Sequence, residues 1–191
     1  MKKIGLYFGS FNPIHVGHLI IANYMVEFTE LDQLWFVISP HNPLKKKSSL
    51  LEDYHRYEMA YRVLNKDERF VISDIEFRLP KPSYTIDTLT YLEEKKPGNK
   101  FSLIMGSDGL HTFNKWKNSA IISKNYKRFV YPRPGTPVEV YAKHENITVV
   151  DAPQMDISST FLRKAIKEEK DIRYFIPKEA YDYLLEMNFY R

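Results

Sequence analysis

The fold of this chain is decided by residues 9–19, GSFNPIHVGHL. They follow an apolar run at residues 4–8 and precede a second apolar run, so the pattern predicts a strand, a tight turn and a helix in direct succession. Gly9 can adopt backbone angles that are closed to other residues, and its missing side chain lets a ligand approach the main chain. The Asn-Pro pair that follows is typical of a turn.

Two histidines stand at the predicted start of this helix. His15 and His18 are three residues apart, so they share one face of a helix. The first backbone N–H groups of a helix lack intrahelical partners and carry the positive end of its dipole. The pattern therefore indicates a site for a polyphosphate. Gly17 lies between the histidines and would let the helix approach a flat base or a sugar.

This stretch resembles the H-x-G-H signature of the nucleotidyltransferase superfamily. Members of that superfamily join a nucleoside triphosphate to a phosphate-bearing acceptor and release pyrophosphate. Either histidine alone would be typical of an ordinary surface or core position. Their conjunction with the glycine turn favours a nucleotide site.

The length and composition suit a single domain, residues 1–191, with a substantial core. There is no cysteine, which excludes disulfides and thiolate metal sites and is compatible with a reducing compartment. The sequence shows neither a signal peptide nor an apolar segment of membrane-spanning length, so we expect a cytoplasmic protein. The net charge of +4 suits anionic partners. No zinc-finger or aromatic RNA-binding signature accompanies it, and we expect no nucleic-acid partner.

Apolar runs of strand length alternate with helical patterns, which favours parallel strands joined by crossover helices. We therefore expect an α/β fold with a Rossmann-like, doubly wound, mainly parallel sheet flanked by helices. Strands are predicted at residues 4–8, 34–38, 70–72, 101–105, 128–131 and 147–150.

Three helices connect the first strands in this prediction. The second begins at Ser49 with a capping-box pattern and continues to Leu64, and the third begins near Ser83 and ends before Pro97. Residues 40–49 and 131–137 are expected to be loops that could gate the site. The first helix is expected to bury Leu19, Ile20, Tyr24 and Phe28.

A second phosphate-binding pattern lies near the C-terminus, at residues 156–163, DISSTFLR. Ser158 or Ser159 would cap the helix that follows, which is the ordinary role of a serine there. Arg163, about one turn into that helix, adds a guanidinium fork suited to phosphate oxygens. The pattern resembles the second superfamily signature, I-S-S-T-x-x-R.

The middle of the chain narrows the resemblance. Residues 83–89 (SYTIDTL), 106–108 (GSD), Trp116 and 133–135 (RPG) are similar to the bacterial nicotinate-nucleotide adenylyltransferase family, and the similarity runs nearly end to end. It extends over residues 42–45, 56–59 and 174–177. Two positions depart from the common pattern, because Ser10 and Asn12 stand where many members have Thr and Asp.

The resemblance implies a Rossmann-like enzyme of NAD biosynthesis that transfers AMP from ATP to nicotinate mononucleotide, giving deamido-NAD and pyrophosphate. It implies Mg²⁺ held by the nucleotide and water, with no metal site of the protein itself. The catalytic residues would be His15 and His18. ATP would be bound by Gly9, Ser10, Phe11, His15, Gly17, His18, Lys45, Ser158, Thr160 and Arg163. The acceptor would be bound by Tyr84, Thr85, Asp108, Trp116 and Arg133.

Two alternatives stay open at this point. Other H-x-G-H enzymes, such as phosphopantetheine, glycerol-phosphate and choline-phosphate nucleotidyltransferases, take acceptors without a pyridine ring. A nucleotide-sensing module would keep the fold without turnover, although the intact histidines and Arg163 argue against it. Release of pyrophosphate from ATP in the presence of an acceptor separates an enzyme from a sensor.

Overall fold

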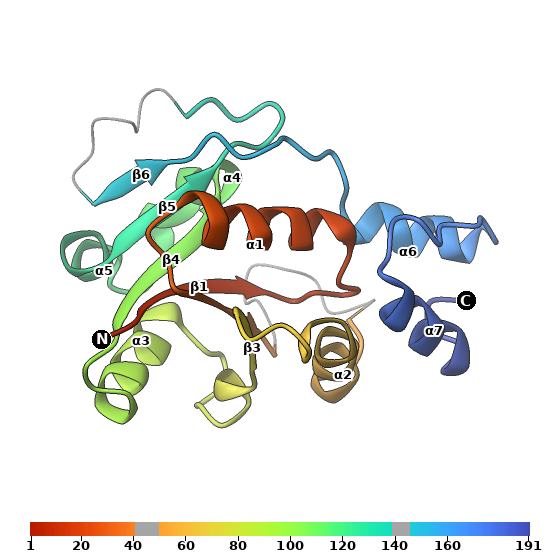
Figure 1. Ribbon diagram of the computed structural model, residues 1–191, viewed down its shortest axis with the longest axis horizontal. Coiled ribbons are helices and arrows are strands. Elements are labelled where there is room, and N and C mark those ends of the chain that lie inside the picture. Colours follow the sequence, from red (N-terminus) through yellow and green to blue (C-terminus); the bar gives the residue numbers. More distant parts are fainter. Residues whose placement is uncertain (41–49, 139–145) are drawn as a thin grey trace.

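Parallel strands form the central layer, and their order in the sheet is β3-β2-β1-β4-β5-β6 (Figure 1). The computed structural model describes residues 1–40, 50–138 and 146–191. Every pair of neighbouring strands in the described sheet is parallel, which confirms the α/β prediction. The strands are β1 Lys3–Gly9, β2 Gln33–Ile38, β3 Phe70–Ser73, β4 Lys100–Gly106, β5 Lys127–Tyr131 and β6 Ile147–Val149.

Helices cover both faces of this sheet, as a doubly wound fold requires. The α-helices are α1 Val16–Phe28, α2 Asp53–Leu64, α3 Thr85–Lys95, α4 Ser107–Thr112, α5 Ser119–Asn125, α6 Ser159–Lys167 and α7 Lys178–Glu186. The described residues also form two short 3₁₀ helices, η1 Ile75–Phe77 and η2 Phe113–Lys115. Figure 1 shows α6 and α7 together at the end of the molecule where β1 stops and α1 begins.

The strands bury side chains on both faces, and alternate residues of one strand enter different cores. In β1, Leu6 packs with α3, α4 and α5, whereas Tyr7 packs with α1, α2, α6 and α7. In β4 the same alternation places Leu103 in the first of these cores and Ile104 in the second. This explains why the strands read as continuous apolar runs in the sequence.

The predicted buried face of the first helix was wrong. Phe28 is 70% exposed, whereas the buried residues of α1 are Gly17, Ile21, Ala22 and Met25. Apolar residues occur nearly all round this helix, so their spacing does not single out one face. Leu19 and Tyr24 pack at the edge of the core, and Tyr24 stacks on Phe28 near the surface.

The second helix begins later than its capping-box pattern predicted. Residues 50–52 are not helical, Glu52 is the N-cap of α2 and Asp53 is its first residue. Ser49 lies outside the described residues. The backbone at Leu51 is bound elsewhere, because its N–H donates to Asn12 Oδ1 (3.2 Å) and its carbonyl accepts from Arg56 (2.9 Å). The third helix begins at Thr85, two residues after the predicted start.

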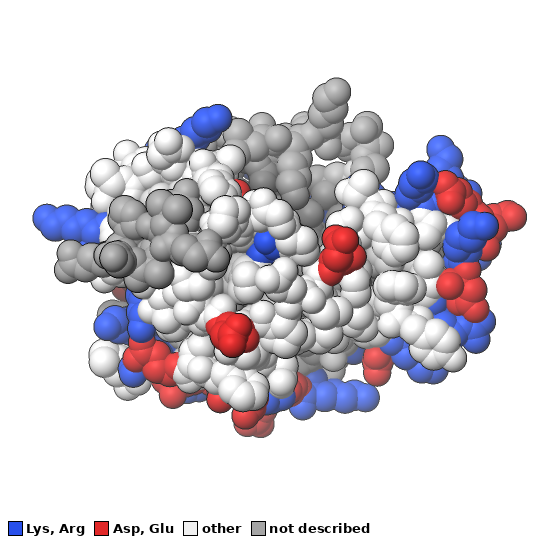
Figure 2. All heavy atoms as spheres, turned by 90° about the horizontal axis from the view of Figure 1, so that it is seen from above, with Lys and Arg blue, Asp and Glu red and all other residues white. Residues whose placement is uncertain are grey.

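The chain crosses from one side of the sheet to the other between β1 and β4, which are neighbours in the middle. Ligands of open α/β sheets bind outside the carboxyl ends of the strands at such a crossing point. No helix among the described residues is long and apolar enough to cross a membrane. Figure 2 shows charges of both signs interspersed at the end that carries α6 and α7.

Candidate active site

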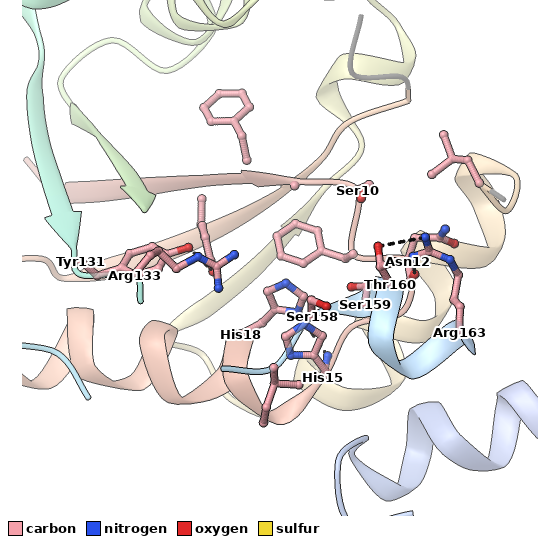
Figure 3. Close-up of a pocket in the computed structure, with 16 residues that line it drawn as sticks. Ser10, Asn12, His15, His18, Tyr131, Arg133, Ser158, Ser159, Thr160 and Arg163 are labelled. Atoms are coloured by element: carbon pink, nitrogen blue, oxygen red, sulfur yellow. Dashed lines mark hydrogen bonds between the residues drawn. The ribbon is translucent and has the colours of Figure 1, made fainter. Parts of the chain in front are cut away.

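A pocket of about 260 Å³ opens at the carboxyl end of β1. Figure 3 shows that Arg133 and Arg163 lie on opposite sides of the pair His15 and His18. The lining residues that the structure describes include no Asp or Glu, so the pocket is suited to an anion. They are Tyr7, Phe8, Gly9, Ser10, Phe11, Asn12, His15, His18, Leu50, Tyr131, Arg133, Ile157, Ser158, Ser159, Thr160 and Arg163.

The turn after β1 takes its shape from Phe11 rather than from Gly9. Phe11 has the left-handed backbone angle (φ 43°), whereas Gly9 ends the strand. A Cβ on Gly9 would come within 2.8 Å of the Phe11 ring, so glycine is needed here for close packing. Gly9 therefore does not use the wider range of backbone angles open to glycine, and its missing side chain serves the close packing instead.

The two histidines lie next to each other at the start of α1, as their spacing predicts. His15 is the N-cap, and the two rings stack with centroids 3.7 Å apart. The backbone N–H of His15 donates to Nδ1 of His18 (3.2 Å). Because Nδ1 accepts this bond, the ring proton of His18 is on Nε2, where it is a hydrogen-bond donor. A Cβ on Gly17 would come within 3.1 Å of the His15 ring, and Gly17 lines a small second cavity beside the pocket.

His15 is uncharged at neutral pH. Burial, aided by the charge of Arg133, lowers its pKa from 6.5 to about 4. Its side chain is 4% exposed, and its Nδ1 has no hydrogen-bond partner within the described part of the chain. The positive charge of the pocket therefore comes from the arginines rather than from His15.

This depressed pKa predicts a loss of stability in acid. Above pH 6.5 His15 is neutral in the folded and unfolded chain, and between 6.5 and about 4 only the unfolded chain binds the proton. We expect the free energy of unfolding to fall by about 3 kcal/mol over this range because of His15. Denaturant titrations at several pH values give the free energy of unfolding of wild type and His15→Asn as a function of pH. The loss due to His15 is the difference between the slopes of these two plots. Parallel slopes for the two proteins would show that His15 is not the responsible group.

The C-terminal motif is bound directly to the glycine turn. Of the two serines predicted as possible caps, Ser158 caps α6 by accepting from the N–H of Phe161 (3.2 Å). Ser159 donates to the carbonyl of Pro13 (3.0 Å), and Arg163 donates to the carbonyl of Asn12 (2.8 Å). The two sequence motifs, almost 150 residues apart, thus form one wall of the pocket.

Arg163 also donates to the Thr160 hydroxyl (3.2 Å), which is the dashed bond in Figure 3. Its guanidinium is therefore already oriented by two protein oxygens before any ligand arrives. Thr160 and Ser10, both predicted ATP-binding residues, line the same pocket. Lys45, the remaining one, lies outside the described residues.

A tyrosine pair and an ion pair form the opposite side. The hydroxyls of Tyr7 and Tyr131 are 3.2 Å apart, and burial raises the pKa of both. Arg133 Nε lies 3.6 Å from Asp108 Oδ1, so these two predicted acceptor residues are neighbours. A Cβ on Gly106 would come within 2.4 Å of Asp108 and 3.1 Å of Arg133, and glycine there makes this approach possible.

The other predicted acceptor residues do not line the pocket. Tyr84 and Thr85 begin α3, and Trp116 follows η2. Tyr84 and Trp116 pack at the edge of the core formed with α3, α4 and α5. Since α3 follows β3 and η2 follows β4, all three residues belong to connections that leave the carboxyl edge of the sheet.

Two supporting side chains were missed in the sequence. Arg56 is fully buried, and it donates to the carbonyls of Ser10 (2.7 Å) and Ser39 (2.8 Å). Tyr190, near the C-terminus, donates to Asn12 Oδ1 (2.6 Å). The amide at position 12 thus accepts two bonds that hold the turn, one from Tyr190 and one from the Leu51 N–H.

Fold and site together define the class of protein. The 3-2-1-4-5-6 parallel sheet is the arrangement of Rossmann-like nucleotide-binding proteins. Its pocket lies at the crossing point of the sheet and combines histidines, hydroxyls and arginines beside the starts of α1 and α6. Such a set is suited to the phosphates of a nucleotide.

Comparisons with known proteins agree with this class. A family model described as cytidylyltransferase-like matches residues 6–165. A probable nicotinate-nucleotide adenylyltransferase of Christiangramia forsetii is 52% identical to this chain. The match covers 100% of this chain and 99% of that protein. A second, from Flavobacterium johnsoniae, is 53% identical, with 99% of each chain covered. The chain therefore belongs to the cytidylyltransferase-like family, and within it to the nicotinate-nucleotide adenylyltransferases.

Solved structures share the fold. Plasmodium falciparum nicotinic acid mononucleotide adenylyltransferase complexed with NaAD has a TM-score of 0.84 at 23% identity, covering 100% of this chain and 98% of that one. The same protein complexed with APC gives a TM-score of 0.82 at 22% identity, with the same coverage. The matched region includes the C-terminal helices α6 and α7.

Proposed function

We propose that this protein transfers AMP from ATP to nicotinate mononucleotide, forming deamido-NAD and pyrophosphate in NAD biosynthesis. The observation that carries the proposal is the junction of the two motifs, where Ser159 and Arg163 bind the turn that leads to His15. This junction places histidines, hydroxyls and a guanidinium around one pocket. The relatives named above bear the name of this activity.

ATP occupies the pocket with its phosphates against the starts of α1 and α6. His18 donates from Nε2 to the α-phosphate, and neutral His15 contacts the triphosphate. Ser158, Thr160 and Arg163 hold the outgoing phosphates. Lys45 would close over them, and Gly9, Ser10, Phe11 and Gly17 form the surface against which the nucleotide lies.

The acceptor phosphate attacks the α-phosphorus in line, and pyrophosphate leaves. Both partners are already phosphates, so no covalent intermediate with the protein is needed, and the protein contributes positioning and charge neutralisation. The charge comes from Arg133 and Arg163 on the two sides of the histidine pair.

Magnesium enters this scheme with ATP. The described residues contain no group of three His, Cys, Asp or Glu side chains that could hold a metal ion. We assign Mg²⁺ to the nucleotide phosphates and water, because this ion keeps several waters and usually binds together with substrate phosphates. No step of the proposed mechanism requires a residue to bind the metal.

Nicotinate mononucleotide binds along the carboxyl edge beside the first turn of α3. Trp116 offers a face for the pyridine ring, and the backbone at Tyr84 and Thr85 binds the ring carboxylate. Asp108, held by Arg133, lies between the two nucleotides.

We expect the acid to be used in preference to the amide. A carboxylate only accepts hydrogen bonds, whereas an amide presents an NH₂ donor to the N–H groups at the start of α3. When the amide NH₂ meets these N–H donors, neither group has an acceptor. We therefore expect kcat/KM for the amide to be about tenfold to a few hundredfold lower than for the acid. Competition of nicotinate and nicotinamide mononucleotide in one ATP reaction measures this ratio.

The same assay tests the function itself. Pyrophosphate release that depends on nicotinate mononucleotide supports an enzyme, and its absence with every acceptor would support a nucleotide-sensing module instead. Release with phosphopantetheine or glycerol phosphate, but not with a pyridine nucleotide, would contradict the proposed acceptor.

A further inference from the structure

Glu76 is a buried carboxylate outside the pocket. It lies in η1, between β3 and α3, and is 2% exposed. A carboxylate removed from water is costly unless hydrogen bonds replace the lost solvent. Its partners therefore indicate why the fold keeps an acid at this position.

Three hydroxyl groups donate to this carboxylate. Thr88 Oγ1 lies 2.9 Å from Oε1, and Ser83 Oγ lies 3.1 Å from Oε2. The side chain of Ser39 is the third partner. Burial raises the pKa of Glu76, and the three hydroxyls oppose this effect by stabilising the charged form.

Two of these bonds enclose the predicted acceptor segment. Ser83 precedes Tyr84 and Thr85, and Thr88 follows them by one turn of α3. Tyr84, the N-cap, makes no side-chain capping bond among the described residues. The bonds to Glu76 thus hold the beginning of α3 without using the N–H groups of its first turn, which the Tyr84 side chain does not cap.

The third bond connects this segment to the ATP turn. The backbone N–H of Ser39 donates to the carbonyl of Gly9 (2.9 Å), and the carbonyl of Ser39 accepts from Arg56 (2.8 Å). One carboxylate is therefore linked, through Ser39, to the end of β1 and, through Ser83 and Thr88, to the start of α3.

We propose that Glu76 is a positioning residue that fixes the acceptor-binding start of α3 relative to the glycine turn. This inference rests on the proposed function, because it assigns the nicotinate carboxylate to the backbone at Tyr84 and Thr85. Glu76 touches neither substrate. It acts by keeping the N–H groups of the first turn in the geometry that the acceptor requires.

The test uses variants that each change one side chain of this network. Thr88→Val keeps the buried shape and removes one donor, Ser83→Ala removes another, and Glu76→Gln replaces the acceptor. Thr90→Val is the matched control, since Thr90 is exposed on the same helix and its hydroxyl donates to the Ile86 carbonyl (3.0 Å) rather than to Glu76. Steady-state kinetics with ATP and nicotinate mononucleotide, together with thermal unfolding, are measured for all four.

We expect the KM for nicotinate mononucleotide to rise about tenfold in Thr88→Val and Glu76→Gln. The KM for ATP should stay within about twofold of wild type, and Thr90→Val should match wild type. An unchanged acceptor KM in folded Thr88→Val and Ser83→Ala would overturn the inference while wild-type turnover upholds the function. Equal rises in both KM values, accompanied by a lower Tm, would show a merely structural role and also overturn it. Should Glu76→Gln not fold, the two hydroxyl variants decide alone. A wild-type protein that releases no pyrophosphate with nicotinate mononucleotide would contradict the proposed function itself.

Discussion

His18→Ala should lower kcat by about 10²–10³, with the fold retained. The His18 ring stacks on the His15 ring and makes an edge contact with Phe11, with ring centroids 4.9 Å apart. Its Nδ1 accepts a hydrogen bond from the His15 backbone N–H. The Nε2 proton is therefore preoriented, and a donor that need not reorganise stabilises charge that develops on the α-phosphate. Rapid-quench or steady-state kinetics, with the thermal unfolding curve as a check of the fold, measure the effect.

Two amide variants separate this role from a structural one. His18→Asn offers an amide oxygen near the position of Nδ1 and can keep the bond to the His15 N–H, but it has no donor at the position of Nε2. His18→Gln extends its amide further and can restore a donor. We expect Asn to be almost as slow as Ala and Gln to recover part of the rate. A His18→Asn protein within a few-fold of wild type would remove His18 from the chemistry.

The sequence was sufficient for the sheet because each strand is a short, continuous apolar run. All six predicted strands are present, with ends within one residue of the prediction. The helix starts at His15 and Ser158 were equally predictable, since the capping position and the motif coincide there. Local pattern and tertiary structure agree at these points.

The predictions were poorest where tertiary packing, rather than the local sequence pattern, determines the structure. The sequence pattern places Phe28 in the core. Because α1 is apolar on nearly all sides, the packing of neighbouring elements decides which of its faces is buried. Gly9 reads as the residue with unusual backbone angles, but the Phe11 ring occupies the space beside it and Phe11 itself takes the positive φ. In both cases the answer depends on a neighbour that periodicity does not identify.

Long-range polar contacts were also beyond sequence reasoning. Tyr190 binds a residue 178 positions away, and nothing in the C-terminal sequence marks it as a partner of Asn12. Arg56 lay within the family resemblance, in the helix around residues 56–59, but its pattern is that of an ordinary helix arginine. Its exposed fraction of 0% was the informative signal, and only the folded chain provides it.

Arg56→Met should lower the free energy of unfolding by about 3–5 kcal/mol. Burial lowers the pKa of Arg56, but its guanidinium still binds Asp53 at 2.6 Å and donates to four backbone carbonyls. Methionine can fill part of the volume but offers no donor to those oxygens, so each of them loses its bond to the guanidinium. The four carbonyls belong to Ser10, Ser39, Pro40 and Leu51. Denaturant unfolding, read from the midpoint at constant m, measures the loss.

Arg62→Met is the matched control, because Arg62 lies on the same helix α2 and its ion pairs are more open to solvent, that to Glu58 partly buried and that to Glu186 exposed. We expect a much smaller loss there, since exposed pairs are screened by water and salt. Similar losses in the two variants would contradict the assignment of Arg56 as the buried support of the turn.

If Arg56→Met is less stable, as expected, its remaining folded fraction should also bind ATP more weakly, because the carbonyl of Ser10 that Arg56 holds belongs to the turn on which the nucleotide lies. Stability and ATP binding would then depend on the same guanidinium, and adding ATP should raise the unfolding midpoint of wild type more than that of the variant.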